Sequence, residues 1–435
     1  MRAPGRAGAC ILTLAIGGGP AAAQPAEPLR LAALQRAALE HDARAKEVDL
    51  LSTQSDLRAR NIETERYPAI SVLGQTQYQS DVPTPPPFIP GGQPLFVPPK
   101  DTYDLSLRVD QRLYDAGTSA RLALAHADLA ESQARVRTTL YALRTEVTES
   151  FFAAALLQEQ LGALTATLDD LEARLRETAV RVREGAALAG EAGAIEATLL
   201  QQGQRADELR ASRAVSLARL AALTGRPIAD GAAVALPELA AAVASARGGL
   251  DRLRARPEYT QFDRSRERAT RQQDLAAAQD RPQVSVYGRL GYAQPGLNVI
   301  GDGFETYALA GLQLQWKAWT WGASGREKQA LALQQSIVDA EEAAFTDGLR
   351  RAIQMDAATI DRLQAALAAD DRIVSLRESI QRAARLRLTE GVITAADYVD
   401  RQTETLTAEF DRARHRVELA HAQARLLTTL GLEVQ

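Results

Sequence analysis

The sequence has few of the residues that catalytic and redox proteins depend on. Its 435 residues include one cysteine, four histidines and two methionines. The histidines His41, His126, His415 and His421 show no metal-ligand spacing of the His-Glu-x-x-His type, and the chain has no Walker-type glycine loop and no candidate serine triad. The sequence therefore predicts a protein that is not an enzyme and that carries no metal or other cofactor.

Charge and hydropathy exclude further classes. Lys and Arg number 51 against 55 Asp and Glu, and the formal net charge is -4. Mixed charge of this kind does not form the basic surface that nucleic-acid binding needs. The mean hydropathy is -0.21 and no run of 18 apolar residues occurs, which argues against both disorder and a polytopic helical membrane protein.

The first two dozen residues read as an export signal. Arg2 and Arg6 precede an apolar run over residues 9–16, and the small residues Ala21 to Ala23 follow. This order is typical of a secretory signal peptide, so we predict one over residues 1–23, with cleavage after Ala23. Cleavage would remove Cys10, and an exported chain without cysteine needs no disulfide chemistry.

The remainder repeats itself. Five landmarks recur in the same order at an offset that falls from 214 to about 205 residues, which indicates an internal duplication. The pairs are Tyr67-Pro68 with Arg281-Pro282, Tyr103 with Tyr307, Gly117 with Gly322, Gly185 with Gly391, and Gly225 with Gly431. We divide the chain into a first repeat (24–225), a linker or equatorial segment (226–256), a second repeat (257–431) and a tail (432–435).

Each repeat has two segments of alternating polarity. Between Tyr103 and Leu113 apolar residues alternate with charged ones, which predicts a strand with one apolar face. The corresponding segment of the second repeat changes phase after Leu309, and we expect a bulge at Gly311. Residues 79–100 and 293–305, rich in proline or glycine, are predicted to be loops.

Long helices follow the strands. Apolar residues recur every seven positions from Leu122 to Leu171, broken only by Ser150, which is typical of helices packed as a coiled coil. The 68 residues between Gly117 and Gly185 would span about 100 Å at 1.5 Å per residue.

The strands are suited to a membrane barrel. They have about ten residues and one apolar face, and aromatic residues stand at their ends, as at a membrane interface. Four strands cannot close a barrel, and open edges are not tolerated in lipid, so two chains would share eight strands or three would share twelve. A soluble pair of hairpins with aromatic cores is the alternative. The predicted interface aromatics are Tyr103, Tyr114, Tyr292, Tyr307, Trp316, Trp319 and Trp321.

In order and spacing, these motifs resemble the TolC-like outer-membrane efflux proteins. The resemblance also includes Arg256-Pro257-Glu258 and the segment from Glu390 to Asp400, and it covers nearly the whole mature chain. It implies an α+β membrane protein: a homotrimer in the bacterial outer membrane, with a shared 12-stranded β-barrel continued by a 12-helix periplasmic α-barrel. The first repeat departs from the family at Glu40-His41-Asp42, where Asn-Pro is usual, but Asp42 can still cap a helix.

The resemblance also implies a function and partners. Such channels are the exit ducts of tripartite efflux pumps and pass small molecules from an inner-membrane pump and a periplasmic adaptor, known as a membrane fusion protein, to the exterior. The outer component of type I protein secretion is an alternative, and a periplasmic coiled-coil scaffold or adaptor is an alternative of another class. The alternating strands argue against a scaffold, which needs only the heptads. The cargo is not readable from the sequence.

Candidate functional residues lie at the helical turns farthest from the strands. By resemblance, Glu184, Gly185, Glu390 and Gly391 would form the adaptor-docking tips. Asp397 and Asp400 would form the periplasmic gate, with Glu191 as the acidic residue at the first tip. Three residues apart, the aspartates share a helical face, and a threefold assembly would turn each into a ring of carboxylates. The alternatives are plain C-cap glycines and first-turn aspartates stabilised by the helix dipole.

Overall fold

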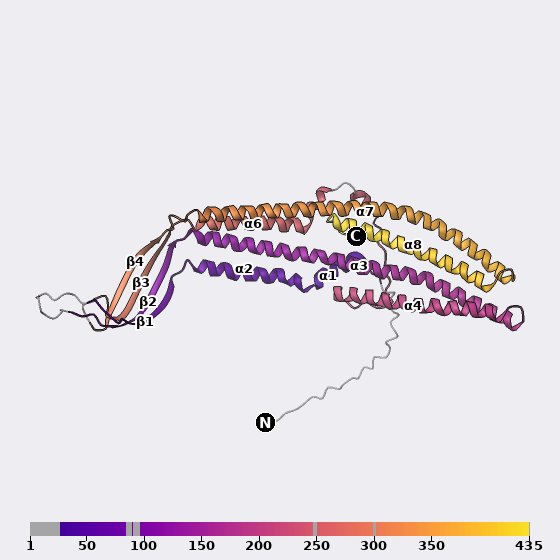
Figure 1. Ribbon diagram of the computed structural model, residues 1–435, viewed down its shortest axis with the longest axis horizontal. Coiled ribbons are helices and arrows are strands. Elements are labelled where there is room, and N and C mark those ends of the chain that lie inside the picture. Colours follow the sequence, from indigo (N-terminus) through magenta and orange to yellow (C-terminus); the bar gives the residue numbers. More distant parts are fainter. Residues whose placement is uncertain (1–26, 84–88, 90–95, 247–249, 299–301, 435) are drawn as a thin grey trace, which may run out of the picture.

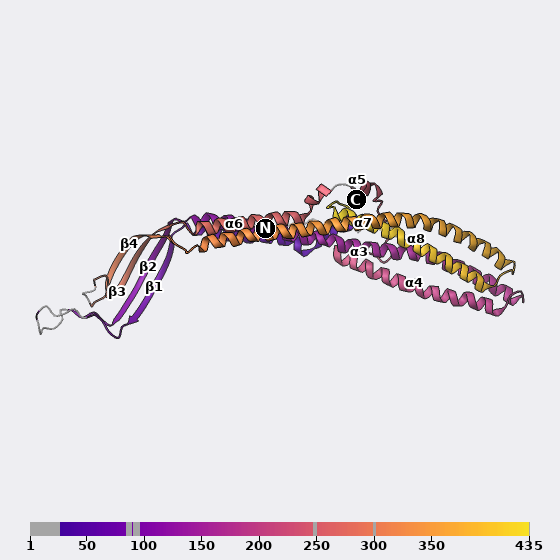
Figure 2. The same ribbon diagram turned by 45° about the horizontal axis from the view of Figure 1, so that its top comes forward.

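The computed structural model describes residues 27–83, 89, 96–246, 250–298 and 302–434. The molecule is a long rod with a four-stranded sheet at one end and paired helices that end in two turns at the other (Figures 1 and 2). No helix in these ranges is both long and apolar enough to span a lipid bilayer.

Helices and strands follow one order in both repeats. The first repeat contains α1 (Leu31–His41), η1 (Ala43–Lys46), α2 (Glu47–Thr64), β1 (Ala69–Tyr78), β2 (Asp101–Tyr114), α3 (Ala116–Arg183) and α4 (Ala189–Thr224). Between the repeats lie α5 (Ala240–Ala246) and η2 (Leu250–Ala255). The second repeat contains α6 (Pro257–Ala278), β3 (Gln283–Gln294), β4 (Glu305–Gln315), α7 (Ala323–Thr389) and α8 (Ala395–Thr429). The predicted signal peptide lies outside the described residues.

The strands form one antiparallel sheet in the order β1-β2-β3-β4. Directly paired residues share a face, so the register sorts the side chains. One row reads Val72, Leu107, Leu290 and Ala308, and the next reads Ser71, Arg108, Arg289 and Leu309. One face of the sheet is therefore apolar and the other mainly polar.

The expected bulge at Gly311 is wrong. Gly311 pairs with Tyr287 in an uninterrupted β3–β4 ladder, and the one register shift lies between Arg112 and Tyr114 on β2. The phase change has another cause. Tyr307 lies on the mainly polar face, where its hydroxyl donates to Asp104 Oδ2 at 2.7 Å, so an aromatic residue occupies a polar position of the alternation.

The helical part is built from coiled pairs. α3 packs against α4 and α8, and α7 packs against α8; nearer the sheet, α3 lies between α2 and α6, and α7 packs on α6. The predicted heptad residues Leu164 and Leu171 are fully buried, so they form the seam between helices. Asp42, which stands where the resembled family usually has Asn-Pro, keeps a capping role. Its side chain accepts a hydrogen bond from the Arg44 backbone N–H at 2.8 Å.

The main core lies midway along the rod, where both repeats and the segment between them meet. Phe151 and Leu220 of the first repeat and Ile360 and Leu427 of the second belong to it, all at most 1% exposed. Val243 of α5 joins them. This junction makes the two repeats one packed body.

Arg256 secures the junction. Its guanidinium donates to the carbonyls of Thr428 at 3.3 Å and Thr429 at 2.9 Å, at the end of α8, and pairs with Glu258 at 2.5 Å. The Tyr141 hydroxyl donates to the Thr428 carbonyl at 2.6 Å. The buried side chain of Arg256, which immediately precedes α6, thus satisfies the last carbonyls of α8.

Replacing Arg256 by Ala is expected to destabilise the fold by about 2 to 3 kcal/mol, because it leaves the partly buried Glu258 carboxylate and the last carbonyls of α8 without their donor. The midpoint of thermal unfolding, followed by circular dichroism in detergent, measures the change. Arg210→Ala, which breaks the exposed pair with Asp207, is the control and should cost less than about 1 kcal/mol. Equal midpoints for the two variants would contradict the junction role.

His421 makes the same region sensitive to pH. Its ring stacks on Phe152 at 4.9 Å between centroids. Burial lowers the pKa of His421, and the nearby Arg425 cation lowers it further, whereas the carboxylates of Glu149, Asp356 and Glu418 act in the opposite direction. Neutral imidazole is therefore favoured in the folded protein. The contribution of His421 to the stability of the fold is complete above the pKa of about 6.5 that the residue has in the unfolded chain. It is lost as the pH falls through the lower pKa of His421 in the folded protein.

We expect the thermal midpoint to fall more steeply between pH 7.5 and pH 5 in the native sequence than in His421→Phe, which keeps the stack but does not titrate. Thermal melts across this range measure both slopes. Identical slopes would show that carboxylates alone set the acid sensitivity.

Candidate functional site

The two turns at the far end of the rod share one backbone design. At the end of α3, the Gly185 N–H donates to the Val182 carbonyl at 3.1 Å and the Ala186 N–H to the Arg181 carbonyl at 2.8 Å. The same two bonds close the end of α7, with Gly391 in the place of Gly185. Both glycines have positive φ, 75° and 73°, as this C-terminal motif requires. Gly185 and Gly391, with the flanking Glu184 and Glu390, are exposed.

The helices that leave these turns start differently. Thr394 caps α8: its hydroxyl oxygen accepts the Asp397 N–H at 3.2 Å, and Asp397 Oδ2 accepts the Thr394 N–H at 3.0 Å. Leu188, at the start of α4, has no capping side chain, and Glu191 is the acidic residue of that first turn. The predicted similarity of the tips thus holds for the backbone, but a capping box occurs at the second turn only.

The predicted gate residues are exposed carboxylates. The hydrogen bonds from Thr394 lower the pKa of Asp397, and the nearby Arg401 lowers it further, so this side chain is charged at neutral pH. Among the described residues, its contacts all use Oδ2, which leaves Oδ1 open to solvent. Asp400 lies one turn on and is exposed, whereas Glu191 is half-buried. Asp397 stands in the first turn of α8, as the helix-dipole alternative supposes, and the capping box is an additional role that leaves one carboxylate oxygen free.

The sequence analysis missed the contacts that join the two tips. Tyr398 of α8 is fully buried, and its hydroxyl donates to Asp170 of α3. Its pKa is raised, by burial first and then by this bond. Arg181 of α3 reaches across to the Leu388 carbonyl at 2.7 Å. Tyr398 lies between the two predicted gate residues, and an aromatic residue in the first turns of a predicted helix was the available signal.

Most of the predicted interface aromatics lie where expected along the strands. Tyr103 and Tyr292, 43% and 52% exposed, pack with Phe304 at the loop end of the sheet. Tyr114 and the three tryptophans stand at the helix end and are exposed. Tyr307 differs from the expectation. Tyr307 is 9% exposed, and its ring covers Gly291 on the mainly polar face. A Cβ atom at position 291 would therefore collide with the ring.

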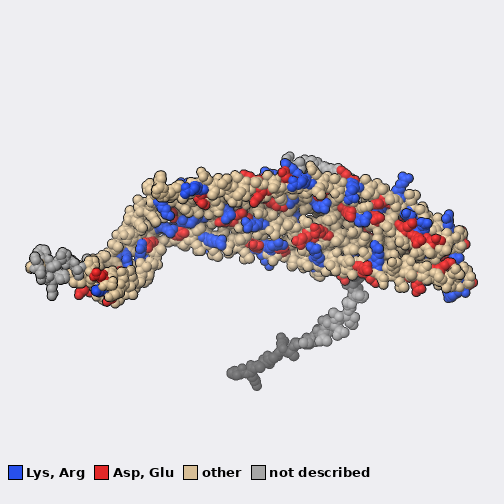
Figure 3. Space-filling view, in the orientation of Figure 1, with Lys and Arg blue, Asp and Glu red and all other residues tan. Residues whose placement is uncertain are grey.

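Exposed apolar side chains gather on the apolar face of the sheet and on the outer helices. α6 and α8, where described, carry no exposed large apolar residue, and α3 carries one, Val180 near its end. The outer helices carry Leu50 and Leu57 on α2, Leu200 and Val215 on α4, and Leu333, Ile337, Met355, Ile373, Leu376, Ile380 and Leu386 on α7. In the space-filling view, charges of both signs are scattered along the helices and are sparser over the sheet (Figure 3).

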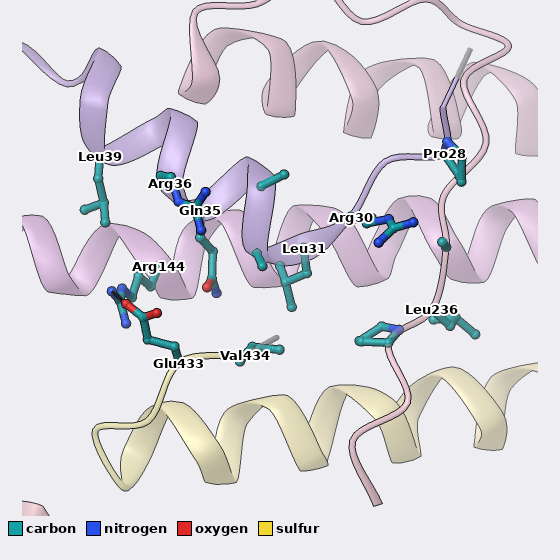
Figure 4. A pocket seen from close by; sticks show the side chains of 14 residues that line it. Pro28, Arg30, Leu31, Gln35, Arg36, Leu39, Arg144, Leu236, Glu433 and Val434 are labelled. Atoms are coloured by element: carbon teal, nitrogen blue, oxygen red, sulfur yellow. Dashed lines mark hydrogen bonds and ion pairs between the residues drawn. The ribbon is translucent and has the colours of Figure 1, made fainter. Parts of the chain in front are cut away.

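A cavity of about 690 Å³ lies beside the central core, lined by α1, α3 and the C-terminal residues. Figure 4 shows Leu31, Leu236 and Val434 around it, with Arg144 beside Glu433 at its edge. None of the predicted site residues lines it. In the described part of the chain, no group of three or more His, Cys, Asp or Glu side chains could hold a metal ion.

Comparisons with known proteins agree with this architecture. Residues 30–226 match the family described as outer membrane efflux protein. No significantly similar sequence was found among curated proteins.

The fold is shared with solved channels. A membrane protein from Pseudomonas aeruginosa superposes with a TM-score of 0.69 at 18% identity, covering 92% of this chain and 90% of that one. The outer membrane protein VceC of Vibrio cholerae gives 0.67 at 17% identity, over 93% and 97%. The MtrE outer membrane channel of Neisseria gonorrhoeae, in its open state, gives 0.67 at 18% identity, over 93% and 90%.

The sequence match covers the first repeat, and the structural matches cover both. Outer membrane efflux proteins are channels rather than enzymes. The sequence of residues 30–226 therefore matches the outer membrane efflux protein family, and the whole described chain shares the fold of solved outer membrane channels.

Proposed function

We propose that the chain forms a homotrimeric exit duct that spans the outer membrane and the periplasm. In this proposal three chains share a 12-stranded barrel and a 12-helix tunnel. An inner-membrane pump and a periplasmic adaptor deliver small molecules to it. The observation that carries the proposal is that one chain has two unfinished lateral edges, which run through both the sheet and the helices.

The sheet edges come first. β1 and β4 each have one neighbour, so each presents an unpaired row of backbone groups. Unpaired backbone groups cost several kcal/mol each in lipid, which closed barrels avoid. Pairing β4 of one chain with β1 of the next removes both edges, and three chains close a ring of twelve strands.

The helical edges support the same closure. One edge consists of α2 and α4, on the side of β1, and the other consists of α7, on the side of β4. These are the helices that carry the exposed leucines, isoleucines and valines. Packing α7 of one chain against α2 and α4 of the next would bury both sets, as a ring-forming interface requires.

The dimensions of the sheet suit an outer membrane. Tyr103 and Tyr114 stand at opposite ends of β2. At about 3.3 Å per residue and a tilt of about 40°, the strand between them crosses about 28 Å. An apolar band of about 25 Å between aromatic girdles is typical of outer-membrane barrels. Val72, Leu105, Leu290 and Leu312 lie within this band and are 61% to 71% exposed in the single chain.

The residues of the two tips are proposed to form the periplasmic gate and the surface that docks onto the adaptor. In a threefold assembly Asp397 and Asp400 would each form a ring of three carboxylates, with Glu191 nearby on α4. Asp397 is charged at neutral pH, and such rings attract cations. The exposed turns with Glu184, Gly185, Glu390 and Gly391 would meet the adaptor. Type I protein secretion would use the same duct with another pump, and the fold does not discriminate between the two cargo classes.

The proposed duct is tested by extracting the protein from outer-membrane fractions and measuring mass by light scattering and shape by negative-stain imaging. We expect a trimer roughly 140 Å long, from the helical stretch of about 100 Å plus the barrel. A soluble periplasmic monomer or dimer would overturn the proposal in favour of a coiled-coil scaffold.

Replacing Asp397 and Asp400 by Ala is expected to leave the trimer intact and to weaken both cation selectivity and block by divalent cations in planar bilayers, because both rings of charge are lost. The variant with Asn at both positions keeps side-chain size and removes the charge, so it should match the Ala variant if charge is the cause.

Asp207 and Asp274 provide the matched control, since both are exposed carboxylates paired with an arginine away from the tips. Their double Ala variant should keep the selectivity of the native channel. Unchanged selectivity and block in the Asp397 and Asp400 variants would remove the gate assignment while leaving the duct.

A further inference from the structure

The mainly polar face of the sheet holds two arginines directly opposite each other. Arg108 of β2 pairs in register with Arg289 of β3, so both side chains point to the same face at the same level. Ser71 and Leu309 complete this row and contribute no charge. Like charges directly opposite on neighbouring strands are unfavourable, so this row needs support from its surroundings.

Carboxylates and tyrosine rings supply that support from the rows above and below. Arg108 donates through Nε and Nη2 to Asp110, at 2.8 and 2.9 Å. Arg289 donates through Nη2 to Asp104 at 2.9 Å and through Nε to the Ser106 hydroxyl at 2.9 Å. Each guanidinium also lies over a tyrosine ring, Tyr287 for Arg108 and Tyr307 for Arg289, at 5.4 and 5.7 Å from the centroid.

These contacts do not use all the N–H donors of the two arginines. In the described part of the chain, neither Arg108 nor Arg289 uses its Nη1 group in a hydrogen bond with protein, and the side chains remain 37% and 28% exposed. The two guanidiniums turn to opposite rows, Arg108 toward Asp110 and Arg289 toward Asp104, and each keeps a spare N–H group of the kind that an oxyanion accepts.

A purely structural role does not account for Arg108. The contacts of Asp104 tie β2 to β3 and β4, so Arg289 and Tyr307 join strands. Arg108, in contrast, bonds Asp110 on its own strand, two residues away, and its side chain reaches β3 only through the ring of Tyr287. The ion pair with Asp110 orients the Arg108 guanidinium along β2 and does not itself link two strands.

We propose that Arg108 and Arg289 form an oxyanion-binding belt in the barrel lumen, with six guanidiniums in the trimer, which takes carboxylate, sulfate or phosphate groups of leaving cargo. The inference rests on the proposed duct, because only closure of the barrel turns the polar face into a lumen. The belt lies in the membrane-embedded part, at the end of the molecule opposite the aspartates of the tip, and it offers free cationic N–H donors where the tip offers carboxylates.

The test uses the full-length trimer in planar phosphatidylcholine bilayers, with inorganic phosphate titrated from the side of the strand loops. Phosphate is expected to reduce the single-channel chloride current. Arg108→Gln combined with Arg289→Gln should raise the half-blocking phosphate concentration about tenfold, since two charge-assisted donors are lost from a hydrated site. The reversal potential should also move toward cation preference.

Arg112→Gln is the matched control. Arg112 lies on the same strand, but its row partner is Ser285 and its guanidinium pairs with Glu65 at 2.6 Å. Its loss should leave the phosphate block unchanged. The single variant Arg108→Gln breaks no ion pair between strands and loses only the contact with the Tyr287 ring, so it keeps the test decisive if the double variant does not assemble.

Four results separate the possibilities. Equal phosphate block in the native channel and in Arg108→Gln overturns the belt, and so does an equal loss in Arg112→Gln. Failure of the native protein to conduct at all counts against the proposed duct itself. A block that disappears with Arg108→Gln and persists in the Asp397 and Asp400 variants supports two independent charged elements.

Discussion

Lateral incompleteness is the constraint on which the rest of this structure depends. A four-stranded sheet with an apolar outer face leaves backbone groups unpaired at β1 and β4, and lipid offers them no partner. The helical part is incomplete at its edges too, because α2, α4 and α7 carry most of its exposed large apolar side chains. The outermost elements of the sheet and of the helices lie on the same two sides of the chain, so the proposed association with further copies would complete both parts together.

The duplication explains how one chain provides two such edges. Each repeat contributes a hairpin of strands and a pair of long helices, and the core around Phe151 and Ile360 fuses them midway along the rod. Arg256 lies at this fusion point and satisfies the carbonyls at the end of α8. The tips are joined separately, through Tyr398 with Asp170 and Arg181 with Leu388. Between these two places, the apolar seams of the coiled pairs hold the helices together.

Charge is distributed along the rod in a way that fits transport rather than catalysis. The carboxylates of Asp397 and Asp400 stand exposed at one end, and the paired arginines of the sheet lie at the other. Neither group is gathered into a deep pocket. The capping box lowers the pKa of Asp397 and keeps its charge at neutral pH, while Asp110 and Asp104 hold the guanidiniums of Arg108 and Arg289 in ion pairs. Both arrangements fix charge where an aqueous path would run.

Periodicity alone was enough to predict the strands, the long helices and the positions of the glycine turns, because these depend on residues close together in sequence. Heptad spacing identified Leu164 and Leu171 as buried, and paired landmarks identified the duplication. The sequence failed where a side chain finds a partner far along the chain. Tyr307 was assigned to the membrane interface and Gly311 to a bulge, because the alternation cannot show that the Tyr307 ring covers Gly291 and that its hydroxyl meets Asp104. Tyr398, Arg181 and the opposed Arg108 and Arg289 were likewise decided by tertiary structure, since strand register and helix packing bring together residues that the sequence separates by up to 228 positions.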